Sequence, residues 1–165
     1  MEHLTAAARE RVLDILRQAR DMTLATIRPD GYPQATTVSY VHDGLTLYAG
    51  IGLGSQKADN IQHNSKVSAT VNLDYADWRH IRGISLGGTA EFVQGEEETG
   101  RVAEALLRKF PEAKEFAQGA PALPWQGLLF LRITPTVISL LDYSLGFGHT
   151  ELYAVSSERE ERAGS

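Results

Sequence analysis

The chain has 165 residues, a length that suits one domain with a hydrophobic core, and its 42% hydrophobic and 22% charged residues are ordinary for a globular protein and favour neither a fibrous nor a disordered class. A formal net charge of -5 argues against general binding to nucleic acid or an anionic membrane. The absence of cysteine excludes disulfides, thiolate metal sites and a cysteine nucleophile.

The N-terminal third of the sequence predicts one helix followed by three strands. Apolar residues recur at three- and four-residue spacing from Leu4 to Leu16, which indicates an amphipathic helix with Thr5 as its N-cap. From Met22 the hydrophobic period changes to two. Strands are expected over 22–28, 33–41 and 45–51. The turn sequences PDG and HDG separate them, so we interpret the three strands as a meander.

The middle and the end of the chain predict four more strands and further helices. The segment QKADNIQHN predicts a short helix of about two turns. Strands are expected over 66–73, 81–93, 127–135 and 136–143. Gly87 and Gly88 indicate a bulge or a close backbone approach. Helical spacing returns over 95–118, with Pro111 as a break.

This order of elements predicts a mainly β fold. Several short antiparallel strands with turn signals, and a few helices outside them, favour a small closed or nearly closed barrel, because closure removes exposed strand edges. Residues 1–155 are expected to form a single domain. The last ten residues, 156–165, are polar and charged and are expected to be a mobile tail.

The sequence GSQKADN brings a hydroxyl, an amide and an ammonium to the start of the short helix. Free backbone N–H groups and the partial positive charge of a helix N-terminus can bind an anion, and Lys57 adds a full charge. Alternatively, Ser55 only caps the helix and Lys57 is a solvated surface residue, an interpretation that the spacing alone favours.

Three segments carry a resemblance to a known family. They are GYPQATTVS (31–39), LYAGIGLGSQKADNIQHNSKVSATVN (47–72) and ISLGGTAEFV (84–93). In this order and spacing they resemble the pyridoxamine 5'-phosphate oxidase-like superfamily of FMN-binding split barrels, over roughly residues 10–155. The resemblance implies a split β-barrel of antiparallel strands with flanking helices. It also implies a flavoprotein homodimer with two FMN molecules at the subunit interface.

The family pattern, together with the capping serine, assigns a set of cofactor-binding residues. These are Thr36, Thr37, Val38, Ser39, Tyr48, Ala49, Ser55, Gln56 and Lys57. Gln56 and Lys57 match a basic pair that grips the phosphate, with Gln56 in place of the usual arginine. Because an amide does not replace a bidentate arginine, we expect lower phosphate affinity or a compensating approach of Arg82. Since side chains alternate along a strand, Thr36 and Val38 are expected to face one side and the residues that follow each of them the other.

The substrate side departs from the oxidase that gives the superfamily its name. Val41 stands where that enzyme has a lysine and Phe147 where it has an arginine, while His149 matches its histidine. Vitamin B6 oxidation is therefore not assigned, and the substrate and any catalytic residue stay open. We expect Phe147 to cover the flavin ring and His149 to bind substrate or to act as an acid. The alternative is a tight turn in which Asp142 or the backbone satisfies the histidine.

The function expected is that of an FMN-dependent oxidoreductase with a small-molecule substrate, in which the flavin carries the hydride chemistry. One alternative is a reductase that uses a deazaflavin coenzyme, whose longer acidic tail would require more basic residues than Lys57. Another is a non-catalytic flavin- or haem-binding protein, with His149 as the candidate axial ligand.

Other partners and sites are not expected. No metal site is predicted, because the five histidines have no carboxylate at ligand spacing. No apolar run approaches the ~20 residues of a membrane span, and the N-terminus is polar where a signal peptide would be apolar. We therefore expect a cytoplasmic protein without nucleic-acid or membrane partners.

Overall fold

The computed structural model of the protein describes residues 1–117 and 127–156, so that nearly all of the expected tail lies outside the described residues. The helices are α1 (Ala6–Gln18), α2 (Gln56–His63), α3 (Glu96–Lys109) and α4 (Ala113–Ala117), with 3-10 turns η1 (Trp78–His80) and η2 (Tyr143–Leu145). The strands are β1 (Glu2–His3), β2 (Asp21–Ile27), β3 (Pro33–Ser39), β4 (Val41–Asp43), β5 (Thr46–Gly52), β6 (Lys66–Asn72), β7 (Arg82–Phe92), β8 (Leu128–Asp142) and β9 (Thr150–Ala154).

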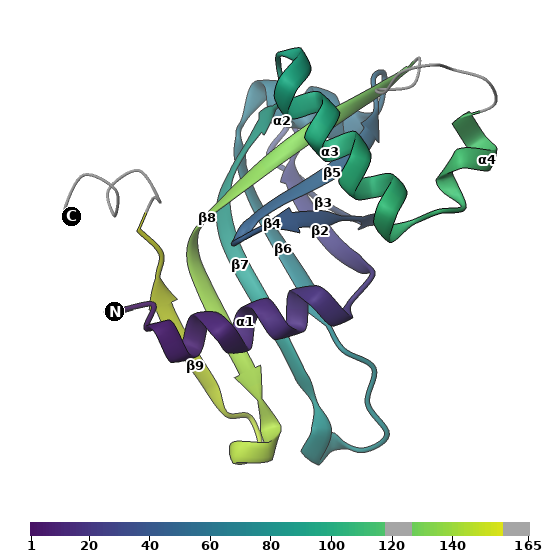
Figure 1. Cartoon of the computed structure of the whole chain (residues 1–165). Coiled ribbons are helices and arrows are strands. Elements are labelled where there is room, and N and C mark those ends of the chain that lie inside the picture. The colour runs from purple at the N-terminus through teal and green to yellow at the C-terminus, as the bar shows by residue number, and fades with distance from the viewer. Residues whose placement is uncertain (118–126, 157–165) are drawn as a thin grey trace, which may run out of the picture.

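The nine strands of the described residues form one curled sheet. Its order is β1-β9-β8-β7-β6-β2-β3, while β5 pairs with β8 and β4 pairs with β5. The pairs are antiparallel except β1 with β9, and β3 contacts β5, which brings the sheet close to a barrel. Figure 1 shows α1 lying across the strands, with α2 and α3 at one end of the barrel. The mainly β fold with flanking helices is therefore confirmed.

The expected meander is wrong in its second pairing. In the part of the chain that the structure describes, β3 pairs with β2 alone, whereas β5 pairs with β4 and with β8. Tyr40 separates β3 from β4, because its side chain is completely buried and its hydroxyl donates to the Leu16 carbonyl at 2.6 Å. This anchor ends β3 and lets the chain begin a new hairpin, whose second strand pairs with a strand far along the sequence.

The two final strands expected from the sequence are one strand, β8, with 15 residues. The proline in its middle is accommodated by a bulge, where the register with β7 shifts between Gly87 and Gly88. A Cβ atom on Gly88 would lie 2.2 Å from the Thr134 carbonyl oxygen. Both the bulge and the close backbone approach are thus confirmed. Proline lacks an N–H, so an interrupted ladder is where a sheet tolerates Pro135.

The helices α1 and α2 begin at the capping residues that the sequence predicts. Thr5 accepts a hydrogen bond from the Ala8 N–H at 3.1 Å, which confirms it as the N-cap of α1. On α3, Val102 and Phe110 are buried in a small cluster with Val41, while the two leucines between them are only half-buried. No helix within the described ranges is both long enough and apolar enough to cross a membrane.

Candidate functional site

The N-terminus of α2 presents unused backbone donors. Ser55 has an extended backbone and accepts a hydrogen bond from the Ala58 N–H at 3.2 Å. It therefore caps the helix, as the alternative interpretation of this segment states. The N–H groups of Gln56 and Lys57 have no acceptor within residues 1–117 and 127–156. Capping therefore uses part of this helix end and leaves two N–H groups for an anion.

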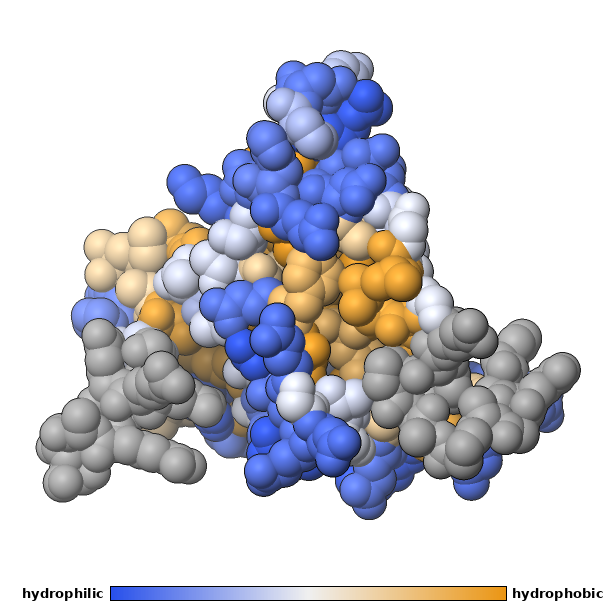
Figure 2. Space-filling model, turned by 90° about the horizontal axis from the view of Figure 1, so that it is seen from above, coloured by the Kyte–Doolittle hydropathy of each residue, from blue (hydrophilic) through white to orange (hydrophobic). Residues whose placement is uncertain are grey.

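The side chains of the two residues after the cap behave differently. The Lys57 side chain is half-buried and makes no hydrogen bond or ion pair with another described residue. The Gln56 amide donates to Asn60 Oδ1 at 2.8 Å, so it is engaged along the helix. Viewed from the end of the barrel that carries α2 and α3, apolar surface lies between hydrophilic regions (Figure 2). This end of the barrel therefore carries both α2, with the Lys57 ammonium, and apolar surface.

Asn60 positions α2 and was not singled out by the sequence. Its side chain is completely buried and its Nδ2 lies 2.9 Å from Thr26 Oγ1 and 3.1 Å from Gln34 Oε1. These contacts tie α2 to β2 and β3, because buried amides need partners. The sequence signal that could have identified Asn60 is its position on the same helix face as Ala58 and Ile61, which are both buried.

The strand β3 brings the predicted threonines and their neighbours next to this helix. Thr36 and Val38 are half-buried, whereas Thr37 and Ser39 are exposed, which confirms the expected alternation. The Thr36 Oγ1 atom is buried without a hydrogen-bond partner among the described residues. A buried hydroxyl without a partner is costly, so this atom indicates a group that the protein chain does not supply.

The two predicted residues on β5 face opposite sides. Ala49 is completely buried in the main core, so only its backbone can reach a ligand. Tyr48 lines a cavity of about 210 Å³ under α3, together with Glu98 and Arg101. Burial, with a smaller effect of the Glu98 charge, raises the pKa of Tyr48. Lys57 does not line this cavity, so the structure places Tyr48 and Lys57 in different surroundings.

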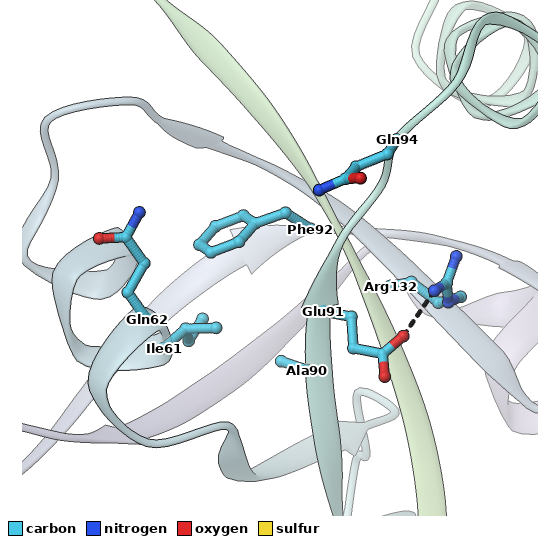
Figure 3. A pocket seen from close by; sticks show the side chains of 7 residues that line it. All are labelled: Ile61, Gln62, Ala90, Glu91, Phe92, Gln94 and Arg132. Carbon is cyan, nitrogen blue, oxygen red and sulfur yellow. Dashed lines mark hydrogen bonds and ion pairs between the residues drawn. The ribbon is translucent and has the colours of Figure 1, made fainter.

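A second cavity, of about 520 Å³, lies between α2 and β7 (Figure 3). Ile61 and Phe92 give it apolar lining, Gln94 projects over it, and the ion pair between Glu91 and Arg132 borders it. It is formed beside the second half of α2, whereas the free N–H groups lie in the first turn. The two features are therefore neighbours and not one site.

The remaining predicted residues lie at the other end of the barrel. These are Arg82, Phe147 and His149. The strand β6 leaves α2 at Lys66 and ends at Asn72 opposite Gly83, and its seven residues span about 20 Å. Figure 1 shows α2 at one end of the molecule and the turn between β8 and β9 at the other. Within one chain, these three residues therefore lie far from Lys57.

Phe147 belongs to an exposed aromatic cluster at this end. It is 79% exposed, and its ring centroid lies 5.8 Å from that of Trp78 and 5.5 Å from that of Tyr143. Trp78 is also 65% exposed. Aromatic surface of this kind is typical of a surface that contacts a ligand or another chain.

The cations at this end are paired within the chain. Ion pairs join Arg82 to Asp14 and Asp142, and Arg11 to Asp142 and Glu151. His149 Nε2 lies 3.3 Å from Glu151 Oε2, so the imidazole pairs with Glu151, whereas the alternative interpretation named Asp142 or the backbone as its partner. The expected approach of Arg82 to the Lys57 site does not occur within one chain. Over the described ranges, no three His, Asp or Glu side chains are grouped as metal ligands.

Asp142 stabilises this end in a pH-dependent way. Burial alone would raise the pKa of Asp142, but hydrogen bonds from Ser144 and Arg11 outweigh it and lower the pKa below its ordinary value. A carboxyl group with a lowered folded-state pKa contributes stability above its unfolded pKa, which is about 4. That contribution is lost as the pH falls through the folded-state pKa.

We therefore expect Asp142→Asn to lower the free energy of unfolding by about 1.5–3 kcal/mol at neutral pH and by less near pH 3. Urea denaturation at both pH values measures the difference. Asp74→Asn is the control, because Asp74 is exposed and has no partner within the described ranges. An equal loss at both pH values would show that the charge of Asp142 is not what stabilises the turn.

Comparisons with known proteins agree with this architecture. The family model described as pyridoxamine 5'-phosphate oxidase matches residues 8–140. General stress protein 26 of Bacillus subtilis is 24% identical over 134 residues, which cover 81% of this chain and 88% of that protein.

Solved structures share the fold. A haem-binding protein of Mycobacterium smegmatis superposes on 93% of this chain with a TM-score of 0.74 and 19% identity. The chain spans 60% of the length of that protein. A conserved hypothetical protein of Mycobacterium tuberculosis superposes with a TM-score of 0.71 and 27% identity, over 96% of both chains.

Proposed function

The chain belongs to the pyridoxamine 5'-phosphate oxidase family, and on this premise we propose that it binds FMN and acts as a flavin-dependent oxidoreductase on a small molecule. The observation that carries the proposal is the start of α2. There the first turn of α2 carries two unused backbone N–H groups and Lys57, whose ammonium has no partner in the described residues. This donor set suits a phosphate group, which is the anionic end of FMN.

The residues present fit the cofactor in one further respect. The buried Thr36 hydroxyl lacks a partner among the described residues, and the ribityl chain of FMN carries hydroxyl groups that can satisfy it. The amide of Gln56 is bound to Asn60, so Lys57 supplies the full charge of this phosphate site. When bound, FMN supplies hydride transfer, while the protein binds and orients it.

We propose a homodimer as the functional unit. Within one chain, Lys57 and the cluster around Phe147 lie at opposite ends of β6 and β7. A two-fold axis can bring the Phe147 end of one chain to the Lys57 end of the other. The exposed outer face of β3, with Thr37 and Ser39, and the exposed Trp78 offer surface for such a contact.

Haem binding is the second candidate function. The haem-binding protein of Mycobacterium smegmatis has the same fold, and His149 is half-exposed beside Phe147. The pairing of His149 with Glu151 opposes axial ligation, because the carboxylate holds the imidazole nitrogen that would bind iron. A deazaflavin coenzyme has a longer anionic tail, which would require more basic residues than Lys57 at the start of α2. The start of α2 therefore suits FMN better than a deazaflavin coenzyme.

Visible absorption titrations with FMN, riboflavin, deazaflavin coenzyme and haemin test the proposal. We expect saturable FMN binding with perturbed flavin bands, and riboflavin affinity lower by about 10- to 100-fold, because riboflavin lacks the phosphate. Equal affinities for the two flavins would contradict the phosphate site at α2. A sharp haem band without any flavin binding would replace the function proposed.

A further inference from the structure

We propose that Lys109 is a site of covalent modification, at which a small acyl phosphate acylates the side-chain amine. Lys109 is the last residue of α3, and its half-buried side chain reaches Tyr40, which separates β3 from β4. The acyl donor is expected to be small, because a half-buried amine is open to solvent on one side only. The proposal does not depend on the proposed flavin function.

Two aromatic rings and a backbone carbonyl hold the Lys109 amine. Its Nζ atom lies 3.7 Å from the centroid of the Tyr40 ring and 5.4 Å from that of the Phe110 ring, and both of these residues are buried. The same atom donates a hydrogen bond to the Tyr40 carbonyl oxygen at 2.9 Å. Lys109 forms no ion pair with another described residue, so neutral groups fix the position of its nitrogen.

The charged groups that act on Lys109 come from the start of β2 and from the segment after α3. The Arg20 guanidinium lies 4.9 Å from the centroid of the Phe110 ring and pairs with Glu112 at 2.8 Å. Burial lowers the pKa of Lys109 to about 8, helped by the Arg20 charge and opposed by the Asp21 carboxylate. The ring faces favour the ammonium as well, so the pH dependence of the reaction measures the balance.

A neutral Lys109 amine is oriented for attack. It donates one N–H to the Tyr40 carbonyl, and neither that carbonyl nor the ring faces donate a hydrogen bond to its lone pair. The nitrogen attacks the acyl carbon and forms an N–C bond. The bond between that carbon and the phosphate oxygen breaks, the phosphate leaves with the electron pair, and a proton passes from the nitrogen to water. The product is an uncharged amide that loses the attraction of both rings.

Reactivity and not access distinguishes Lys109 from the exposed lysines. At about pH 7.5, an amine with a pKa of about 8 is about one quarter neutral, whereas a lysine with the ordinary value is only about 0.1% neutral. A less basic amine is also a weaker nucleophile, as is true of thiols, so the expected net advantage is about tenfold. Lys66 and Lys114 are exposed, so access alone would favour them over Lys109.

Treatment of the full chain with acetyl phosphate, followed by mass spectrometry of its peptides, tests the proposal. We expect Lys109 to be acetylated about tenfold faster than Lys66 and Lys114 at about pH 7.5, with a rate that levels off above about pH 8. Arg20→Gln is expected to slow the reaction at Lys109 about two- to threefold, because the lost cation no longer disfavours the ammonium. Arg17→Gln is the matched control, since Arg17 is an exposed arginine in the last turn of α1.

Three outcomes would overturn the proposal. One is acetylation of Lys66 and Lys114 as fast as Lys109, because access alone would then decide the site. Another is a rate at Lys109 that still rises steeply at about pH 10, which would show an ordinary ammonium. The third is an equal rate at Lys109 in Arg20→Gln and Arg17→Gln. Acetylation is detected directly on each lysine, so the result is independent of whether the chain binds FMN.

Discussion

Lys57→Ala is expected to lower the affinity for FMN by about 30- to 1,000-fold while the protein stays folded. The Lys57 side chain makes no hydrogen bond or ion pair with another described residue, so its removal breaks no internal contact. Removing a charged donor from a partly desolvated anion site costs about 2–4 kcal/mol, and each 1.4 kcal/mol is tenfold in affinity. Flavin absorption or fluorescence titration measures the loss.

Lys66→Ala is the control for this substitution. Lys66 is an exposed lysine at the start of β6, so its replacement removes the same charge from the chain without touching the start of α2. We expect FMN affinity within about twofold of the wild-type value for Lys66→Ala, because exposed charges at a distance are screened by salt. Similar losses in both variants would reduce the role of Lys57 to general electrostatics.

Gly88→Ala is expected to lower the free energy of unfolding by about 3 kcal/mol or more, or to prevent folding. The added Cβ atom would lie 2.2 Å from the Thr134 carbonyl oxygen and 2.9 Å from the Pro135 Cα atom. Both are backbone atoms of β8, so relief requires the two longest strands to separate at the bulge. Urea denaturation followed by far-UV circular dichroism measures the change.

Gly100→Ala is the matched substitution with the opposite expected sign. Gly100 lies within α3, and a Cβ atom there would meet nothing within 4 Å. Alanine in a helix interior is more favourable than glycine by about 0.5–1 kcal/mol, so a small gain in stability is expected. If Gly88→Ala were as harmless as Gly100→Ala, the close approach of β7 and β8 would not be what requires glycine.

The candidate site shows how far local sequence signals reach. Ser55 and Lys57 were placed correctly at the start of a helix, because capping involves residues only three apart. The alternation on β3 was likewise predictable, since side chains on a strand alternate with a period of two. The contacts of Asn60 with Thr26 and Gln34 were not predictable, because they join segments that are far apart in the sequence.

The position of the substrate-side residues was also beyond local signals. The resemblance implied a site at a subunit interface with Lys57 and His149 as site residues, and the register of β6, β7 and β8 places these two residues at opposite ends of one chain. The partner of His149, Glu151, lies on β9, a strand that the sequence pattern did not predict. Short strands without strong alternation give little periodic signal, so their pairing depends on neighbours supplied by the fold.

Local chemistry was sufficient for the class of the fold, the starts of α1 and α2 and the glycine bulge. Each of these depends on hydrophobic period, capping or backbone conformation over a few residues. The pairing of β5 with β8, the single strand through Pro135 and the contact between Lys109 and Tyr40 required the folded chain. Each of these depends on contacts between segments that are distant in the sequence. Packing of the whole core decides which segments pair, and this pairing produces no periodic pattern in the sequence.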